Sequence, residues 1–291
     1  MPGLEVAHYK LFFETKDSHL KLDTPLWHSG FTLSNEKTEA VQSSVFCNAC
    51  SLMLQNLPLS RDNTWHSLVA RNKIWELWKD DTDRFVFTNP MQALYRQLVV
   101  DPAFTQGELL GDFSSDATLP GFPLPQDLEI VFFANWLAKY GDIILHASGV
   151  AVDGKGYAFV GPSGVGKSTL AGVLSSEAGV TVLGEDQLVL RLIDNRFWIF
   201  GTPWHVNRSL CAPLGVPLER ILFLDKKDED TLSALTAMEG VTRLLQTAFI
   251  PYYRPELVDD ILERLDTLAN TVSLVHFSYL PGNGVLNRVI N

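Results

Sequence analysis

Short apolar runs separated by turn residues dominate the first part of the chain and predict β-strands. Residues 1–120 show little of the 3.6-residue periodicity of helices, and strands are predicted at 6–13, 73–78 and 84–88. The stretch 91–100 fits either a strand or a short helix. Several tryptophans favour a packed sheet, and no residue in this part carries chemistry that we can name. We therefore expect residues 1–120 to form a mostly β accessory domain.

The pattern changes after residues 114–125, which are rich in serine, proline and glycine and predict a linker. Residues 126–140 are apolar on nearly every side, which is typical of a buried helix. Short apolar strands with tight turns follow, and two further helices are expected near the C-terminus. The predicted strands are 143–145, 149–152, 156–161, 180–183, 187–193, 197–200 and 221–224, and the predicted helices are 167–176, 236–249 and 255–270. Residues 121–291 are therefore expected to form an α/β domain.

A phosphate-binding loop joins a predicted strand to a predicted helix of this second domain. Its residues are Gly161, Pro162, Ser163, Gly164, Val165, Gly166, Lys167 and Ser168, and Thr169 follows them. The glycines let successive backbone N–H groups converge on phosphate oxygens, and the helix N-terminus adds a partial positive charge. Lys167 then reaches the terminal phosphates, and the Ser168 hydroxyl can ligate Mg²⁺. The strand–loop–helix context argues against a glycine-rich turn that matches by chance.

The overall composition narrows the classes of partner. The 291 residues carry 23 basic and 34 acidic side chains, a net charge of −11, without a long basic run. Nucleic acid and anionic membrane surfaces are therefore not expected as partners, because both select for basic surfaces. No segment approaches the roughly 18 uninterrupted apolar residues of a spanning helix. The N-terminus lacks the pattern of a secretion signal, so a cytoplasmic location is expected.

Cysteine usage agrees with a reducing compartment, because the chain has only three cysteines. Cys47 and Cys50 form a CxxC pair, but Cys211 is the only other thiol and no histidine cluster lies nearby, which argues against a zinc site. A redox pair would be expected to open a helix in a βαβ unit. The flanking apolar segments instead favour two small core residues.

Two further features lie near the loop in the sequence. Glu185 and Asp186 follow the predicted strand 180–183, where one carboxylate could bind Mg²⁺ and the other could face an acceptor hydroxyl. The alternative is a polar turn between two strands. His146 closes the predicted strand 143–145, and an imidazole near the acids could tune the basicity of one of them. A structural histidine is the alternative at that position.

The stretch from His146 to Ser168 resembles the catalytic domain of HPr kinase/phosphorylase, and more closely the looser group of HPr-kinase-related proteins. That family has a histidine at this distance before the loop, a Gly-x-Gly hairpin where Gly154-Lys155-Gly156 stands, and the same loop pattern. A carboxylate pair stands where Glu185-Asp186 does. The run 201–204 and the following strand 221–224 are also similar, and the resemblance covers about residues 126–280.

The resemblance implies a mixed-sheet P-loop kinase fold shared with phosphoenolpyruvate carboxykinases. It implies ATP and Mg²⁺ as cofactors, with transfer of the γ-phosphoryl group to a hydroxyl, usually a protein serine. Lys167 would stabilise the transferring phosphate, Ser168 would ligate the metal, and Glu185 would take the position of the base. Asp186 would be a metal or proton-network partner, and His146 would tune the base. HPr kinases are hexameric, so the resemblance also allows a homo-oligomer.

Two departures from the family affect these expectations. The first carboxylate of the family is an aspartate, so the longer Glu185 leaves the choice of base between Glu185 and Asp186 open. The glycine-rich segment that HPr kinases use for HPr has no clear match after Phe200. The acceptor is therefore expected to be a serine of another peptide or protein, or a small hydroxylated molecule. A nucleotide-binding regulatory module without kinase activity is the competing hypothesis, and a motor or transporter ATPase is disfavoured.

Three cationic side chains are weaker candidates for a contact with the γ-phosphate. They are His205, Arg208 and Arg254, of which Arg208 is favoured because a loop after a core strand can reach the site.

Overall fold

The protein is an α+β chain that divides into two compact units, Met1–Trp136 and Leu137–Asn291. The computed structural model describes residues 3–15, 21–22, 30–33, 48–56, 65–89, 96–111, 118–119, 124–205, 210–225, 231–278 and 285–290. The predicted boundary near residue 120 precedes helix α1 (Gln126–Ala138), most of which the contacts group with the first unit. None of the described helices is both long and apolar enough to cross a membrane.

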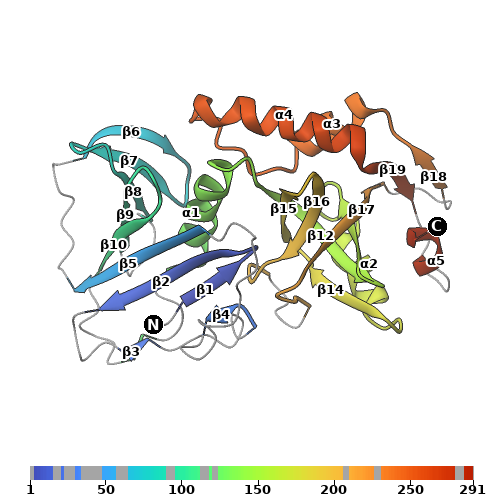
Figure 1. The fold of residues 1–291 in the computed structure, drawn as a ribbon, viewed down its shortest axis with the longest axis horizontal. Helices are drawn as coiled ribbons and strands as arrows, with labels where there is room; N and C mark the ends of the chain where they lie inside the picture. Colours follow the sequence, from blue (N-terminus) through green and yellow to red (C-terminus); the bar gives the residue numbers. More distant parts are fainter. Residues whose placement is uncertain are drawn as a thin grey trace. The chain divides into compact units, whose positions relative to one another are not determined.

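The first unit is built on a mixed nine-stranded sheet in the order β4-β1-β2-β5-β10-β9-β8-β7-β6 (Figure 1). Only the β2–β5 and β5–β10 pairs are parallel. A separate two-stranded pair joins β3 (Lys21–Leu22) and β11 (Thr118–Leu119). The sheet strands are β1 (Gly3–Val6), β2 (Tyr9–Thr15), β4 (Thr32–Leu33), β5 (Asn48–Asn56), β6 (Trp65–Arg71), β7 (Glu76–Asp80), β8 (Phe85–Thr88), β9 (Arg96–Val100) and β10 (Gln106–Gly111).

Aromatic packing forms the core of this unit. The ring of Phe132 on α1 lies 6.2 Å from that of Phe87 on β8 and 5.6 Å from that of Phe104, measured between centroids. Tyr9 on β2 meets Trp136 edge-to-face at 5.0 Å. Such pairs add about 0.5–1.5 kcal/mol each beyond their buried area. The prediction of a buried helix after the linker is confirmed, and these contacts explain why α1 is apolar on nearly every side.

The prediction of one strand over residues 6–13 was wrong. Ala7 and His8 have φ of 52° and 68°, so they make a two-residue turn that separates β1 from β2. Neither residue is a glycine or asparagine, so no turn was predicted here. Residues 96–100 form a strand, as one of the two alternatives for 91–100 had it, and residues 91–95 lie outside the described part.

The burial of Cys50 agrees with its predicted role as a small core residue. Its side chain is fully buried on β5, and burial raises the pKa of the thiol to about 12. The thiol is therefore protonated and unreactive at neutral pH. Cys47 lies outside the described residues.

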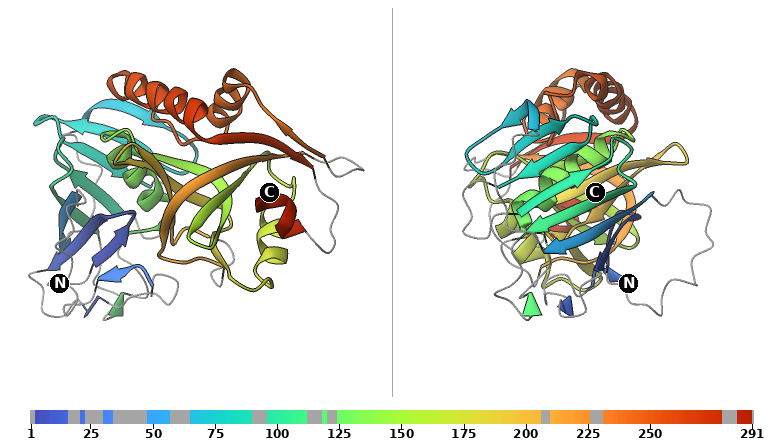
Figure 2. Two further views of the ribbon diagram at one scale, coloured as in Figure 1. Left: turned by 45° about the vertical axis from the view of Figure 1, so that its right-hand side comes forward. Right: turned by 90° about the vertical axis from the view of Figure 1, so that its left-hand side faces the viewer.

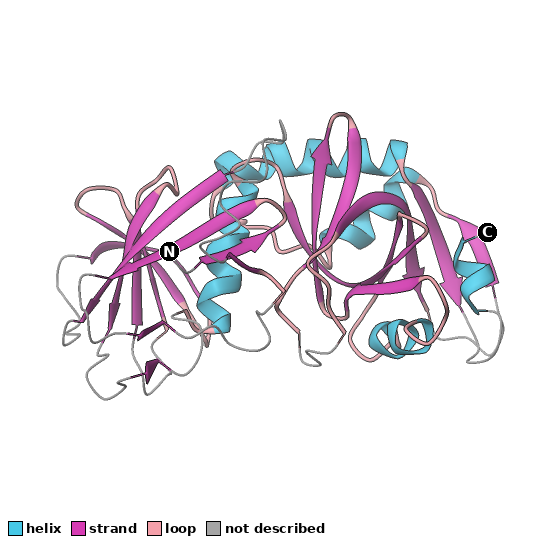
Figure 3. Ribbon diagram, turned by 60° about the horizontal axis from the view of Figure 1, so that its bottom comes forward, coloured by secondary structure: helices cyan, strands magenta, loops and turns pink. Residues whose placement is uncertain are grey.

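The second unit contains two helical layers on opposite faces of its strands (Figure 3). Helix α2 (Lys167–Leu174) packs on one face, and helices α3 (Ala237–Leu245) and α4 (Pro255–Thr271) pack on the other. The strands are β12 (Ile143–Val152), β13 (Lys155–Val160), β14 (Val180–Gly184), β15 (Gln187–Ile193), β16 (Arg196–Gly201), β17 (Gly215–Leu224), β18 (Thr231–Ala234) and β19 (Ser273–Ser278), and helix α5 (Val285–Ile290) follows.

Strands β12 and β17 each pair with three other strands, and some of these pairings close the sheet on itself. The first part of β12 pairs with β15 and the second with β13, while β17 pairs first with β16 and then with β13. The hydrogen-bonded order β13-β12-β15-β16-β17 therefore returns to β13. Gly156 lies inside this ring, because a Cβ there would stand 2.5 Å from Ile199 and 3.0 Å from Val216. Figure 2 shows the strong curvature of these strands.

Most predicted elements of this unit are confirmed, but two strands are longer than expected. Strand β17 was predicted over 221–224 and begins at Gly215. The sequence predicted separate strands at 143–145 and 149–152, but β12 runs through both. Because His146 is polar, the strand over 143–145 was predicted to end there. The predicted hairpin is confirmed, since Asp153 and Gly154 have φ of 50° and 74°, the conformation that a two-residue turn between twisted strands requires. Strands β18 and β19 and helix α5 were not predicted.

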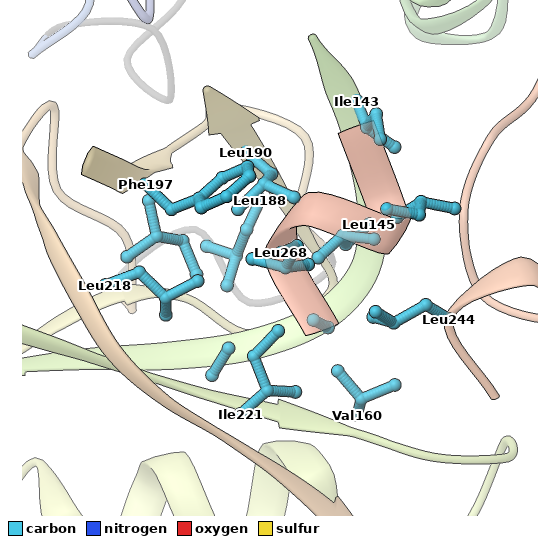
Figure 4. Packing of buried hydrophobic residues seen from close by; sticks show 14 of the residues in the cluster. Ile143, Leu145, Val160, Leu188, Leu190, Phe197, Leu218, Ile221, Leu244 and Leu268 are labelled. Atoms are coloured by element: carbon cyan, nitrogen blue, oxygen red, sulfur yellow. The ribbon is translucent and has the colours of Figure 1, made fainter. Parts of the chain in front are cut away.

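The largest described core of this unit lies between the ring and helix α4 (Figure 4). Helix α4 contributes Leu257, Ile261, Leu265 and Leu268, whose spacing places them on one face. These side chains meet apolar residues of β12, β15 and β17, including Leu145, Leu190 and Ile221.

We expect Leu265→Ala to lower the free energy of unfolding by about 2–5 kcal/mol, because it leaves a cavity in this core. Leu265 is fully buried, whereas Leu262 on the same helix is 38% exposed. Leu262→Ala is the matched control and should cost less than about 1 kcal/mol. Urea unfolding followed by circular dichroism measures both. Equal losses in the two variants would contradict the packing described for α4.

Candidate functional site

The phosphate-binding loop connects β13 to α2 at the point where β13 lies between β12 and β17. Gly164 and Gly166 have φ of 75° and 113°, which a residue with a side chain rarely adopts. Gly166 is also the N-cap of α2, and no side chain caps this helix. Pro162, Ser163 and Gly164 are exposed. The backbone N–H groups of the loop are thus placed on an accessible surface at a helix N-terminus.

Lys167 is the first residue of α2, and its side chain crosses the loop. The Nζ atom donates to the carbonyl oxygens of Gly161 at 2.9 Å and Pro162 at 3.2 Å. Burial lowers the pKa of Lys167, and the negative charge of Asp186 acts in the opposite direction. The ammonium group is thus already held at the loop, where a terminal phosphate would be expected.

Glu185 and Asp186 form the β14–β15 junction, which the sequence had placed just after a strand. Strands β14 and β15 pair with consecutive parts of β12, so Gly184 faces Gly149 and Gln187 faces His146. The junction therefore lies beside the middle of β12. Because Ala147 on β12 also pairs with Val160 on β13, the acids come close to the start of the loop.

Two serine hydroxyls hold the backbone of the junction. The Glu185 carbonyl oxygen accepts hydrogen bonds from Ser148 Oγ at 2.7 Å and from Ser168 Oγ at 3.3 Å. Ser148 lies on β12 and is fully buried, and Ser168 is the predicted metal ligand of the loop. Ser148 was not predicted as a site residue, because a small residue that follows a strand histidine does not indicate a function by itself. The loop helix, β12 and the junction are therefore tied together at one carbonyl group.

His146 and Asp186 form a hydrogen-bonded pair beside the loop. The His146 Nδ1–H donates to Asp186 Oδ1 at 3.1 Å, and both side chains are about one-third exposed, at 35% and 31%. This hydrogen bond lowers the pKa of Asp186, and electrostatic interactions with His146, His205 and Lys167 act in the same direction against the effect of burial. Asp186 is therefore ionised at neutral pH and accessible to solvent.

The Glu185 side chain has different surroundings, although it is the neighbour of Asp186. It is buried, with 7% of the residue exposed. The Glu185 side chain acts on Cys211. Burial raises the pKa of the Cys211 thiol, and the negative charge of Glu185 raises it further. The two carboxylates that the sequence treated as one pair therefore do not share one environment.

The structure changes the interpretation of the weaker cationic candidates. His205 is 3% exposed, and burial lowers its pKa to about 4, so it is neutral at pH 7. The expectation that it supplies a cation to a phosphate was wrong. The Arg254 Nε donates to Glu256 at 3.0 Å at the start of α4. Arg208 lies outside the described residues.

Another acid lies at the same edge of the sheet. Asp225 directly follows β17, and its Oδ2 lies 3.2 Å from His276 Nε2 on β19. Its neighbour Leu224 packs against Gly161, where an added Cβ would stand 3.1 Å from the Leu224 carbonyl oxygen.

In the described part of the chain, no three histidine, cysteine, aspartate or glutamate side chains gather closely enough to hold a metal ion. Two metal ligands were predicted, Ser168 and Asp186. Asp186 belongs to the β14–β15 junction, and Ser168 donates a hydrogen bond to the Glu185 carbonyl oxygen of the same junction. This set fits a cation that takes part of its oxygen shell from phosphate groups, as Mg²⁺ usually does.

Comparisons with known proteins leave the site to be judged on its own geometry. No model of a protein family and no curated protein sequence matches the chain. Among solved structures, the HPr(Ser) kinase/phosphatase from Coxiella burnetii is similar over 50% of this chain and 87% of that chain, with 13% sequence identity and a TM-score of 0.29. A similarity at this TM-score carries no argument about function.

We expect His146→Gln to raise the pKa of Asp186, because it removes the strongest interaction that favours the carboxylate. Carboxyl ¹³C NMR titration measures the change. Asp80 is an internal control, since its pKa is lowered by bonds from Arg84 and Thr82 against the effect of burial and should not move.

The lowered pKa of Asp186 also makes the stability of the folded protein depend on pH. The folded-state pKa of Asp186 lies below the unfolded value of about 3.9. Its interactions therefore stabilise the protein above about pH 4, and this contribution is lost as the pH falls through the folded-state pKa. An unchanged Asp186 titration in the His146→Gln variant would contradict the assigned pair.

Proposed function

We propose that the second unit binds a nucleoside triphosphate with Mg²⁺ and transfers its γ-phosphoryl group to a hydroxyl acceptor. One observation carries this proposal: Ser168 of the loop and the ionised Asp186 meet at the β14–β15 junction, beside a lysine already held at the loop. In phosphoryl transfer, the protein chiefly positions the reacting groups and stabilises the charge of the transition state. These residues provide both.

The loop residues fit the phosphate groups of ATP. Glycines with positive φ direct backbone N–H groups toward a common point, and the uncapped start of α2 adds its partial positive charge. Lys167 neutralises charge that develops on the terminal phosphates. When bound, Mg²⁺ would neutralise phosphate charge, with the Ser168 hydroxyl and the Asp186 carboxylate as its protein ligands.

The two acids take different roles in this proposal. Asp186 faces the accessible side of the junction with His146, so it orients the acceptor hydroxyl and accepts its proton. His146 holds this carboxylate in place and keeps it ionised. Glu185 is buried near Cys211, and we assign it to the support of the junction rather than to the base. This assignment reverses the order that the family resemblance implied.

The acceptor class follows the sequence argument: a serine of a peptide or protein, or a small hydroxylated molecule. The burial of Glu185 favours one competing function, because only one carboxylate of the pair then remains accessible. In that case the unit would bind the nucleotide as a regulatory module and would not transfer phosphate. Nucleotide binding is common to both functions, so turnover distinguishes them.

We expect Lys167→Ala to abolish Mg²⁺-dependent loss of γ-phosphate from ATP and to weaken ATP binding at least about tenfold, because a buried charge at the loop is lost. Calorimetry and γ-³²P transfer measure the two effects. Lys155→Ala is the matched control, since Lys155 is an exposed hairpin lysine paired with Glu219. Wild-type activity in the Lys167→Ala variant would refute the site.

We expect Asp186→Asn to lower kcat about 10²–10⁴-fold, the usual contribution of a positioned acid or base. Glu185→Gln should have a smaller effect on kcat, since the Glu185 side chain is buried near Cys211. Turnover intact in both variants would exclude the acids from catalysis. ATP binding without γ-phosphate loss from the wild-type protein, with any acceptor tested, would instead support the regulatory module.

A further inference from the structure

The peptide group that links Glu185 to Asp186 is held at both of its ends. Its carbonyl oxygen accepts from Ser148 Oγ and Ser168 Oγ, as described above. Its N–H group, which belongs to Asp186, donates to His205 Nδ1 at 3.3 Å. Because C=O and N–H point in opposite directions from one rigid plane, these contacts together fix the plane of this peptide and the position of the Asp186 Cα. The pairing of Gln187 with His146 holds the chain on the other side of Asp186.

The His205 ring is itself held in place by its surroundings. Gly184 lies against it so closely that an added Cβ would stand 2.5 Å from Cε1 and 2.6 Å from Nε2. On its other side, Nε2 lies 3.5 Å from Thr202 Oγ1, and that hydroxyl donates to the Gln187 carbonyl oxygen at 2.7 Å. The ring thus fills the space between the end of β14, the start of β15 and residue 202.

These contacts involve the residues before and after Asp186 in the chain. Gly184 precedes the β14–β15 junction, Gln187 follows it, and His205 contacts the amide between them. His205 and Thr202 are almost fully buried, at 3% and 0% exposure. A buried imidazole with both ring nitrogens directed at named partners has a defined orientation.

We propose that His205 is a positioning residue for Asp186. It acts by accepting the Asp186 N–H, so that the carboxylate keeps its direction toward His146 and the loop. The inference rests on the proposed function and deepens it. It assigns His205 a role through the backbone of the acid, in place of the phosphate contact that the sequence had suggested.

The alternative is a histidine that only fills the core, and two variants separate the alternatives. His205→Leu removes the acceptor and keeps an apolar side chain in the space. His205→Asn retains an acceptor, because Oδ1 can take the place of Nδ1. Leu265→Ala serves as a control that lowers stability and leaves the junction intact.

We expect His205→Leu to lower kcat about 10- to 100-fold and to raise the Mg²⁺ concentration needed for half-maximal activity, as losses of supporting hydrogen bonds around metal ligands do. Binding of ADP without Mg²⁺ should be unchanged, since the loop is not altered. His205→Asn should restore kcat to within a few fold of wild type. Loss in both variants, or in neither, would overturn the proposal, as would an equal loss in Leu265→Ala.

NMR provides a readout that does not require turnover. The imidazole ¹⁵N shifts should show an unprotonated Nδ1 in His205, and the Asp186 amide should exchange with solvent faster in His205→Leu than in His205→Asn. If the wild-type protein has no transferase activity, the proposed function fails while these measurements still test the hydrogen bond. A protonated Nδ1, or equal exchange in the two variants, would overturn the positioning role. Should His205→Leu fail to fold, Thr202→Val tests the same contact by removing the hydroxyl beside Nε2.

Discussion

The closed ring of strands is the constraint on which the rest of the second unit depends. Strand β12 pairs with three strands, so its middle is the meeting point of β13, β14 and β15. The loop leaves β13 beside this point, and the β14–β15 junction crosses it. Three segments that are far apart in the chain are thereby held within hydrogen-bond distance of one another.

Hydrogen bonds to one peptide group convert this convergence into a defined site. Ser148 from β12, Ser168 from α2 and His205 from the segment after β16 all contact the peptide between Glu185 and Asp186. Backbone groups buried from water need partners, and here the partners come from three separate elements. The acid is consequently directed by backbone contacts, and His146 then needs only to pair with its carboxylate.

The separation of the two acids shows how strongly context decides chemistry. Glu185 and Asp186 are neighbours in a bend between two strands, yet their side chains have different surroundings. Asp186 faces His146 and Lys167, whereas Glu185 is buried near Cys211. Burial also made His205 neutral, which a sequence cannot indicate, because the pKa of an imidazole depends on its solvation. Local composition could identify these residues as candidates but could not assign their roles.

The sequence by itself determined the loop, the hairpin at Asp153-Gly154 and the amphipathic helix α4, because each depends on local conformation or on periodicity. Only the tertiary structure decided the continuity of β12 through His146, the clamp on the junction and the burial of Glu185 and His205. These features depend on strand pairing between distant segments, whose register leaves no mark in the local pattern of residues. The phosphate loop was therefore readable from the sequence, whereas the direction of the acid beside it was set by the fold.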